Sequence, residues 1–258
     1  MVQGKKKLRA DQLLVLQGLV ESRERAKRLI MAGQVVVETD GRSEGRVPKP
    51  GSLLARETVL RLVQQERYVS RGGIKLQTGL EAFELDVGGW VALDVGASTG
   101  GFTDCLLQMG VRRVYALDVG YGQLHWKLRQ DPRVINLERI NIRHAGDDLL
   151  PELVDVTVVD CSFISLQMVL PVCARLTRSG GLIMALIKPQ FELEKGATDK
   201  GVVRSNQMQQ AAVDRVMDWA RQAGGFVEIG VVPAKITGPK GNQEYLALWR
   251  VEGKQGQE

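Results

Sequence analysis

Apolar and polar residues alternate in blocks from residue 90 to the end of the chain. The apolar blocks are typical of strands that are buried on both faces of a parallel sheet. The predicted strands are Trp90–Val95, Val114–Asp118, Val134–Leu137, Asp155–Asp160, Gly181–Ile187, Val227–Val232 and Tyr245–Val251. The clearest helix between them runs from an N-cap at Ser205 to a terminating glycine, Gly224. The alternation predicts a doubly wound α/β sheet, whose ligands bind beyond the carboxyl ends of the strands.

The first quarter of the chain has a different pattern. One face of a first helix is marked by Leu8, Leu13, Leu16 and Leu19. A second helix is predicted between an N-cap at Ser22 and a terminating glycine, Gly33. It is followed by a short strand at 34–38, a turn at 39–41 and a Pro/Gly loop at 47–54 that leads into another strand. These elements predict a small α+β domain ahead of the large sheet.

Positive charge is concentrated in this small domain. Of the 35 basic and 30 acidic residues of the chain, 14 and 8 lie in residues 1–67, so the net charge is +6 there and −1 in the remainder. A basic domain attached to a nearly neutral one suggests that the basic domain binds a polyanion. The simpler alternative is that its charge only increases solubility.

Composition narrows the class of protein. The chain has 258 residues, 44% hydrophobic and 25% charged, which is ordinary for a globular protein. No apolar run approaches the roughly 18 residues of a membrane span, and no signal-peptide core follows the basic N-terminus. The three cysteines, Cys105, Cys161 and Cys173, lack the spacing of a disulfide framework or a zinc site. We therefore expect a cytoplasmic protein without a metal ion or a membrane partner.

A glycine-rich loop, in VALDVGASTGGFTD, follows the first predicted strand. Gly96, Gly100 and Gly101 allow a ligand to approach the backbone closely at the start of a helix. Asp94 precedes the loop, and Asp118 ends the second strand, where an acid can bind the two hydroxyls of a ribose. The S-adenosylmethionine methyltransferases share this layout. The glycine spacing differs from G-x-G-x-x-G, and a dinucleotide-dependent enzyme is the competing interpretation.

Four charged residues lie at the ends of predicted elements, namely Lys75, Asp160, Lys188 and Glu244. In a doubly wound fold these positions can converge on the rim beside the glycine loop. A lysine removes the proton of a ribose 2′-hydroxyl only as a neutral amine, a form that burial and a second nearby ammonium favour. The carboxylates would orient the amines and limit the cost of burying their charge.

Several motifs resemble known families. Residues 8–62, with SRERAKRLIMAG, a strand and a KPG loop, resemble the S4 RNA-binding domain. The four charged residues resemble the lysine–aspartate–lysine–glutamate tetrad of FtsJ-like RNA 2′-O-methyltransferases. With YVSRGGIKL, DCSFISL, IKPQFE and ITGPKGNQEYL, residues 8–251 resemble the TlyA (hemolysin A) family. Ser98-Thr99 departs from the Ala-Pro that is common in the broader FtsJ group, but it matches the TlyA subgroup.

The resemblance implies an S4-like RNA-binding domain at 1–64, a linker at 65–73 and a Rossmann-like S-adenosylmethionine methyltransferase domain at 74–258. It implies methyl transfer to a ribose 2′-hydroxyl of ribosomal RNA, with cytidine as the target and ribosomal RNA or a ribosomal subunit as the partner. Lys188 would be the general base, with Lys75 as the alternative. Lys75, Asp160 and Glu244 would then position the base and the ribose.

The expected ligand contacts extend beyond the tetrad. The cofactor site is expected to comprise Asp94, Gly96, Ala97, Ser98, Gly100, Gly101, Phe102, Thr103, Asp118 and Asn141. The RNA-binding residues are expected to be Arg9, Arg23, Arg25, Lys27, Arg28, Lys49 and Arg71. Cationic side chains of this kind bind the phosphate backbone and confer little sequence specificity.

Other interpretations compete with these. Cys161 could suggest covalent cytosine-C5 methylation, but no proline precedes it, so a packing role is preferred. His125 and His144 are expected to be surface or structural residues, and the Gly-rich stretch 195–206 is either an RNA-contacting loop or a plain connection. A non-catalytic RNA-binding module has no need for two clustered lysines, and a membrane-active toxin lacks a suitable amphipathic helix here. The sequence carries no signal for an oligomeric state.

Overall fold

The computed structural model describes residues 7–39, 42–63, 67–194, 196 and 198–252. The chain forms two compact units, Met1–Glu66 and Arg67–Glu258, and each has a hydrophobic core of its own. Parts of the predicted turn at 39–41, linker at 65–73 and stretch at 195–206 lie outside the described residues. Residues 67–73 belong to the second unit, where the Tyr68 ring is buried.

The second unit is built on a seven-stranded sheet with the strand order β11-β12-β10-β9-β6-β7-β8. Its strands are β6 (Val91–Val95), β7 (Arg113–Asp118), β8 (Val134–Glu138), β9 (Val154–Val159), β10 (Thr177–Ile187), β11 (Phe226–Pro233) and β12 (Tyr245–Val251). The five strands from β8 to β10 are parallel, and β12 runs antiparallel between β10 and β11. All seven predicted strands are present, so the predicted doubly wound α/β class is confirmed. The largest difference is β10, which begins four residues before the predicted Gly181.

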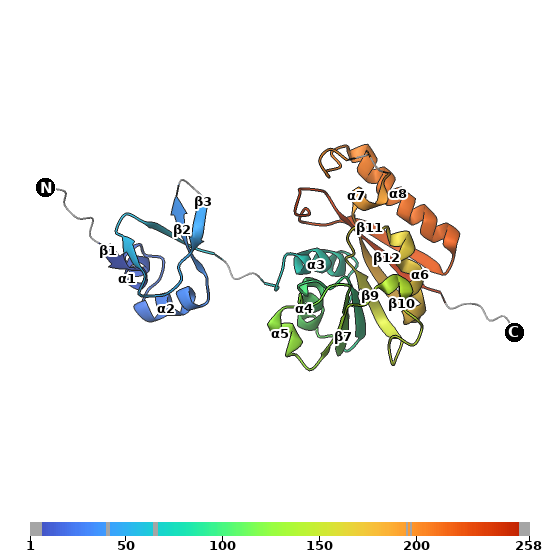
Figure 1. Cartoon of the computed structure of the whole chain (residues 1–258), viewed down its shortest axis with the longest axis horizontal. Helices are drawn as coiled ribbons and strands as arrows, with labels where there is room; N and C mark the ends of the chain where they lie inside the picture. Colours follow the sequence, from blue (N-terminus) through green and yellow to red (C-terminus); the bar gives the residue numbers. More distant parts are fainter. Residues whose placement is uncertain (1–6, 40–41, 64–66, 195, 197, 253–258) are drawn as a thin grey trace. The chain divides into compact units, whose positions relative to one another are not determined.

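Helices cover both faces of this sheet, as Figure 1 shows. They are α3 (Gly72–Ala82), α4 (Gly101–Gln108), α5 (Trp126–Arg129), α6 (Leu170–Leu176), α7 (Pro189–Glu192) and α8 (Asn206–Ala223), with short 3-10 helices η1 (Ile142–His144) and η2 (Leu166–Met168). The predicted caps of α8 are confirmed: Ser205 accepts a hydrogen bond from Met208 N, and Gly224 ends the helix with a φ of +72°. None of the described helices is long and apolar enough to cross a lipid bilayer.

Successive residues of each central strand enter two different cores. In β10, Ile183, Ala185 and Ile187 pack in the core that α6 and α8 cover. Met184 and Leu186 pack in the core that α3 and α4 cover. A strand that is buried on both faces has no polar side, which explains the uninterrupted apolar run at 182–187.

The first unit is a small α+β fold, as its pattern predicts. It contains β1 (Lys7–Arg9), α1 (Ala10–Leu16), α2 (Arg23–Met31), β2 (Val35–Thr39), β3 (Arg42–Arg46), β4 (Leu53–Ala55) and β5 (Val59–Leu62). Its sheets have the orders β3-β2-β5 and β1-β4. Ser22 caps α2 by accepting a hydrogen bond from Arg25 N.

The first predicted helix is longer than the one observed. Leu8 lies in β1 opposite Leu54 of β4, and α1 ends at Leu16. The N–H of Ala10 donates to the carbonyl of Ser52, so the start of the chain continues the pairing with the β4 segment before it turns into the helix. Of the four leucines, Leu13 and Leu16 therefore lie in the helix, Leu19 follows its end, and Leu8 belongs to a strand that packs against the same core as Leu13.

Candidate active site

Sheet register brings the predicted tetrad to one edge of the sheet. β9 and β10 are neighbouring parallel strands, so Asp160 and Lys188, which follow them, leave the sheet at the same end. β12 runs antiparallel to β10, and their pairing continues to the last residue of β10, so Glu244 enters its strand beside Lys188. Lys75 reaches Glu244 from the first half of α3, which packs against β12. Four residues far apart in the sequence are therefore neighbours because of the topology.

The tetrad forms two lysine–carboxylate pairs. Lys75 Nζ lies 2.5 Å from Glu244 Oε2, and Lys188 Nζ lies 2.6 Å from Asp160 Oδ1. Both ammonium groups are buried, and so is Glu244, whereas Asp160 is partly open to solvent. Lys188 Nζ also lies 2.9 Å from Ser162 Oγ. Buried ion pairs with this geometry are expensive to desolvate, so an arrangement of two of them at a sheet edge points to chemistry rather than to stability.

The loop before β12 holds Glu244 in place. A Cβ atom on Gly238 would collide with Glu244 Oε1, so only glycine leaves room for this carboxylate. The same loop is held by Asn242, which is buried, accepts a hydrogen bond from Val203 N and donates one to Gly201 O. A loop that is braced by buried hydrogen bonds fixes the carboxylate that it carries.

The glycine loop lies between the tetrad and the start of α4. Gly96 has a φ of +85°, and a Cβ there would come within 2.7 Å of the carbonyl oxygen of Asp160. Gly100 has a φ of +93° and forms the N-cap of α4. Ala97, Gly101 and Phe102 are buried beneath this turn. The loop therefore passes directly beside the segment that carries Asp160.

Asp94 lies under the loop and is wholly buried. Its Oδ2 accepts a hydrogen bond of 2.6 Å from Thr103 Oγ1, while Oδ1 is buried without a hydrogen-bond partner among the described residues. Burial raises the pKa of Asp94 to about 7, and the negative charges of Asp160 and Asp118 add to this effect, against the opposing Thr103 hydrogen bond. An orphaned buried carboxylate oxygen beside a glycine loop is a fit for a cationic ligand group.

Asp118 ends β7 and holds the other side of the loop. One carboxylate oxygen accepts from Ser98 N at 2.8 Å and the other from Gly120 N at 2.7 Å. Each oxygen keeps a further lone pair for a ligand hydroxyl. Asn141 is exposed after β8 and accepts from Arg143 N through Oδ1, so its Nδ2 is the donor that it can offer a ligand.

Comparison with known proteins decides the family. The model of the FtsJ-like methyltransferase family matches residues 68–250. The chain belongs to this family. The matched range contains the sheet, the glycine loop and all four tetrad residues, so the FtsJ-like unit corresponds to the second compact unit of the structure.

Whole-chain relatives extend the match beyond the FtsJ-like unit. The 16S/23S rRNA (cytidine-2′-O)-methyltransferase TlyA of Mycobacterium tuberculosis is 43% identical, over 95% of this chain and 90% of that protein. Hemolysin A of Brachyspira hyodysenteriae is 37% identical, over 93% of this chain and 98% of that protein. A solved structure from Streptococcus thermophilus is 43% identical, covers 96% of this chain and 90% of that one, and has a TM-score of 0.72. The predicted family resemblance is therefore confirmed.

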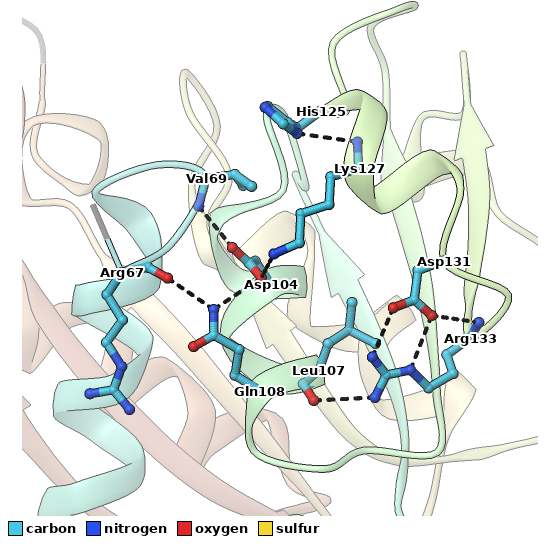
Figure 2. A network of polar contacts seen from close by, with 9 residues as sticks. All are labelled: Arg67, Val69, Asp104, Leu107, Gln108, His125, Lys127, Asp131 and Arg133. Carbon is cyan, nitrogen blue, oxygen red and sulfur yellow. Dashed lines mark hydrogen bonds and ion pairs between the residues drawn. The ribbon is translucent and has the colours of Figure 1, made fainter. Parts of the chain in front are cut away.

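The FtsJ-like unit begins with a segment that sequence reasoning treated as a linker. Figure 2 shows Asp104 of α4 at the centre of a polar network: it accepts from Val69 N at 2.8 Å and from Gln108 Nε2 at 3.1 Å. Gln108 Nε2 also donates to the carbonyl of Arg67, and Lys127 Nζ lies 3.6 Å from Asp104. Residues 67–69 are thereby fastened to the helix that follows the glycine loop.

Four of the seven predicted RNA-binding cations have protein partners. Arg9 and Arg23 both bind the buried carboxylate of Asp11, at 3.0 and 3.1 Å. Lys27 pairs with Glu24 at 2.7 Å. Arg71, in the FtsJ-like unit, donates to the carbonyl of Thr237 at 2.5 Å. Charge that is already paired binds phosphate less strongly, and Asp11 is the residue that sequence reasoning missed.

The other three predicted cations, Arg25, Arg28 and Lys49, are exposed. Within the part of the chain that the structure describes, they form no ion pair. Arg25 and Arg28 project from α2, whose apolar side chains Ala26 and Ile30 are buried. Of the seven predicted cations, these three therefore have the most charge to offer a polyanion.

The residues that sequence reasoning discounted lie in structural positions. Burial raises the pKa of the Cys161 thiol to about 12, which is unsuitable for a nucleophile. His125 caps α5 through Nδ1, which accepts from Lys127 N, and His144 lies in η1 (Figure 2 shows the His125 contact). Among the described residues, no group of three or more His, Cys, Asp or Glu side chains is arranged to hold a metal ion.

Proposed function

We propose that the chain transfers the methyl group of S-adenosylmethionine to a ribose 2′-hydroxyl of ribosomal RNA. The observation that carries this proposal is the pair of buried lysine–carboxylate contacts, Lys75–Glu244 and Lys188–Asp160, beside the glycine loop. Ribosomal RNA and cytidine as the target nucleotide are supported by the name and the 43% identity of the Mycobacterium tuberculosis relative.

Lys188 is the proposed general base. It accepts the proton of the 2′-hydroxyl at Nζ as the oxygen bonds to the methyl carbon, and Asp160 orients the amine through the 2.6 Å contact. Lys75 and Glu244 are proposed to position the ribose and to supply fixed charges beside it. When bound, S-adenosylmethionine supplies a methyl group on a positively charged sulfur, which keeps the electron pair of the broken bond and leaves as a neutral thioether. General-base catalysis of this kind contributes about 10²–10⁴ to a rate.

The residues around the glycine loop fit S-adenosylmethionine. The buried, unpartnered Oδ1 of Asp94 suits the cationic end of the cofactor, and the Asp118 carboxylate suits the ribose hydroxyls. Because Gly96 has a positive φ and no Cβ, the glycine loop packs closely against the segment that carries Asp160. Ser98 N donates to Asp118, and Thr103 Oγ1 donates to Asp94. These two residues therefore fix the shape of the loop, and the ligand contacts are left to the two carboxylates.

Methyl-group mapping tests the proposal. Purified full-length protein is incubated with labelled S-adenosylmethionine and with ribosomal subunits from a strain that lacks the gene. We expect 2′-O-methylcytidine to form at defined rRNA positions, and the same positions to lose the mark in the deletion strain. A label that appears on bases, or an rRNA methylation map that is the same with and without the gene, contradicts the proposal.

The first unit is proposed to be an S4-like RNA-binding domain. Exposed Arg25 and Arg28 are expected to contact phosphates, so replacing both with alanine should reduce the slope of log affinity against log salt by about 2. The matched control is Arg221→Ala, because Arg221 is also exposed but pairs with Asp218 and Glu228 of the second unit. Equal slopes for the double variant and the control would remove the first unit from the RNA interface.

A further inference from the structure

Ser162 is the second polar partner of the proposed base. Its Oγ lies 2.9 Å from Lys188 Nζ, while Asp160 Oδ1 lies 2.6 Å from the same nitrogen. Ser162 comes two residues after Asp160, in the segment that leads from β9 to η2. Neither the tetrad nor the family match assigns it a role.

The number of N–H bonds on the Lys188 amine indicates a role for Ser162. A neutral lysine amine has two N–H bonds and one lone pair, and a charged one has three N–H bonds. An ionised carboxylate has no hydrogen to donate, so in the 2.6 Å ion-pair contact with Asp160 Oδ1 the hydrogen that faces the carboxylate belongs to Lys188. If the Ser162 oxygen accepts the second, both hydrogens are used and the lone pair is directed away from the two partners. That remaining direction is the one from which a substrate hydroxyl must approach.

We infer that Ser162 is a positioning residue that, together with Asp160, orients the lone pair of Lys188 toward the methyl acceptor. The inference rests on the proposed function, because the base must act on a hydroxyl for its orientation to matter. After proton transfer, the same two partners accept from the resulting ammonium without moving. The exposed Ser162 hydroxyl also places that proton one contact away from solvent.

The backbone around Ser162 is fastened at both ends. Before it, Asp160 N donates to the carbonyl of Val95 at 2.9 Å. After it, Ser165 Oγ and Leu166 N donate to the buried carboxylate of Glu192, at 2.6 and 2.9 Å.

Glu192 belongs to α7, which begins directly after Lys188. The segment that carries Ser162 and the segment that carries the base are therefore tied together by a buried carboxylate. Between the two fastenings, Phe163 adopts a φ of +65°, a conformation that bulky residues rarely take and that turns the chain at this point. This fixed backbone supports the 2.9 Å contact between Ser162 Oγ and Lys188 Nζ.

Two substitutions separate the hydroxyl from the backbone. In single-turnover methyl transfer by the full-length protein to ribosomal subunits, Ser162→Ala should be about 5–50-fold slower, the scale of one hydrogen bond to a group that becomes charged. Ser162→Thr keeps the hydroxyl and should stay within about 3-fold of the unsubstituted protein. Affinities for S-adenosylmethionine and for the subunit should change less than about 2-fold, because Ser162 acts through Lys188. Ser179→Ala, an exposed serine at the other end of β10, is the matched control.

The outcomes are distinct. A Ser162→Ala protein as fast as the unsubstituted one overturns the inference and leaves the proposed function standing. A faster one also overturns it, because the hydroxyl would then be donating to the lone pair and blocking it. Equal losses in Ser162→Ala and Ser162→Thr assign the defect to the backbone instead of the hydroxyl. An unsubstituted protein that transfers no methyl group overturns both the proposed function and the inference.

Discussion

The two lysine–carboxylate pairs of the site have similar lengths and different surroundings. In the Lys75–Glu244 pair the side chains are 8% and 1% exposed, and in the Lys188–Asp160 pair they are 9% and 22% exposed. The carboxylate of the first pair is enclosed by a loop that leaves no space for a Cβ at Gly238. The second pair has a serine hydroxyl as an additional partner and a carboxylate that reaches solvent.

This difference supports the roles proposed for the two lysines. A base must change its charge during the reaction, so it needs partners that accept hydrogen bonds in both states and a path by which the proton leaves. Lys188 has both, whereas Lys75 is closed in a pair whose carboxylate has almost no contact with solvent. The closed pair is suited to hold charge in place. The comparison therefore favours Lys188 as the base on physical grounds, beside the family resemblance.

Removing the proposed base gives the largest expected effect. Lys188→Ala should slow single-turnover methyl transfer by about 10²–10⁴-fold, with RNA and cofactor affinities little changed. Lys188→Arg should fail almost as badly, since a guanidinium keeps its charge and does not accept a proton at neutral pH. Near-normal single-turnover rates for Lys188→Arg would break the comparison and move the base to Lys75 or to water.

Opening the closed pair should cost stability. Lys75→Ala leaves the buried Glu244 carboxylate without its ammonium, which should lower the free energy of unfolding by about 3–5 kcal/mol. Lys188→Ala leaves Asp160, which is partly hydrated, so we expect a loss nearer 1–2 kcal/mol. Urea unfolding of both variants measures the difference.

The matched control for the closed pair is the double variant Lys75→Met with Glu244→Gln. It removes both charges and should recover most of the lost stability, because no uncompensated charge stays buried. Equal losses of stability in Lys75→Ala and Lys188→Ala would mean that the two pairs differ less than their exposures indicate.

Gly238→Ala tests the enclosure of Glu244 without changing any charge. The added methyl would meet Glu244 Oε1, so the carboxylate or its loop must shift, at a cost of about 1–3 kcal/mol. Methyl transfer should slow at the same time, because Glu244 moves relative to Lys75. Gly88→Ala is the control, since that glycine is exposed and its nearest neighbour is the side chain of Asp86. Unfolding curves that match for the two variants would contradict the claim that the loop at Gly238 tightly encloses the Glu244 carboxylate.

Two members of the tetrad, Lys188 and Asp160, were predictable because they follow adjacent parallel strands, which place their carboxyl ends at one edge. Lys75, on α3, and Glu244, before the antiparallel β12, were added to the set with the help of the family resemblance. Ser162 and Glu192 were not predictable in the same way. Their contacts depend on a turn at Phe163 with a positive φ, and hydrophobic periodicity does not encode such a turn.

The cations of the first unit show a second limit. Charge counting treats every arginine alike, but Asp11, buried in the first turn of α1, binds both Arg9 and Arg23. A carboxylate within an apolar helix face was the available signal, because such a residue is buried only with a cationic partner. The segment 67–69 was read as a linker for a similar reason: its polar backbone is satisfied by Asp104 and Gln108, which lie about 40 positions away in the sequence.

The smallest expected effect is a change in the pH dependence of cofactor binding. It connects the Lys188–Asp160 pair, the more open of the two, to the proposed cofactor site through Asp94. Burial raises the pKa of Asp94 to about 7, and the charge of Asp160 contributes to the shift. The cationic end of S-adenosylmethionine should prefer the ionised carboxylate, so its affinity should fall as the pH drops below about 7. Asp160→Asn removes a neighbouring negative charge, which should lower the pKa of Asp94 and move the midpoint of this pH dependence down by less than about one unit.

Glu244→Gln, in the Lys75–Glu244 pair, should move that midpoint less, since the charges that raise the pKa of Asp94 most are those of Asp160 and Asp118. Calorimetric titrations with S-adenosylmethionine between about pH 5.5 and 8.5 measure the midpoints, and Asp94→Asn, which should show no such dependence, identifies the group that titrates. If Asp160→Asn and Glu244→Gln move the midpoint equally, the carboxylates of the two pairs affect the pKa of Asp94 to the same extent, and the comparison between the pairs fails at the cofactor site. If only Asp160→Asn moves it, the carboxylate that orients the proposed base also sets the protonation of the cofactor site.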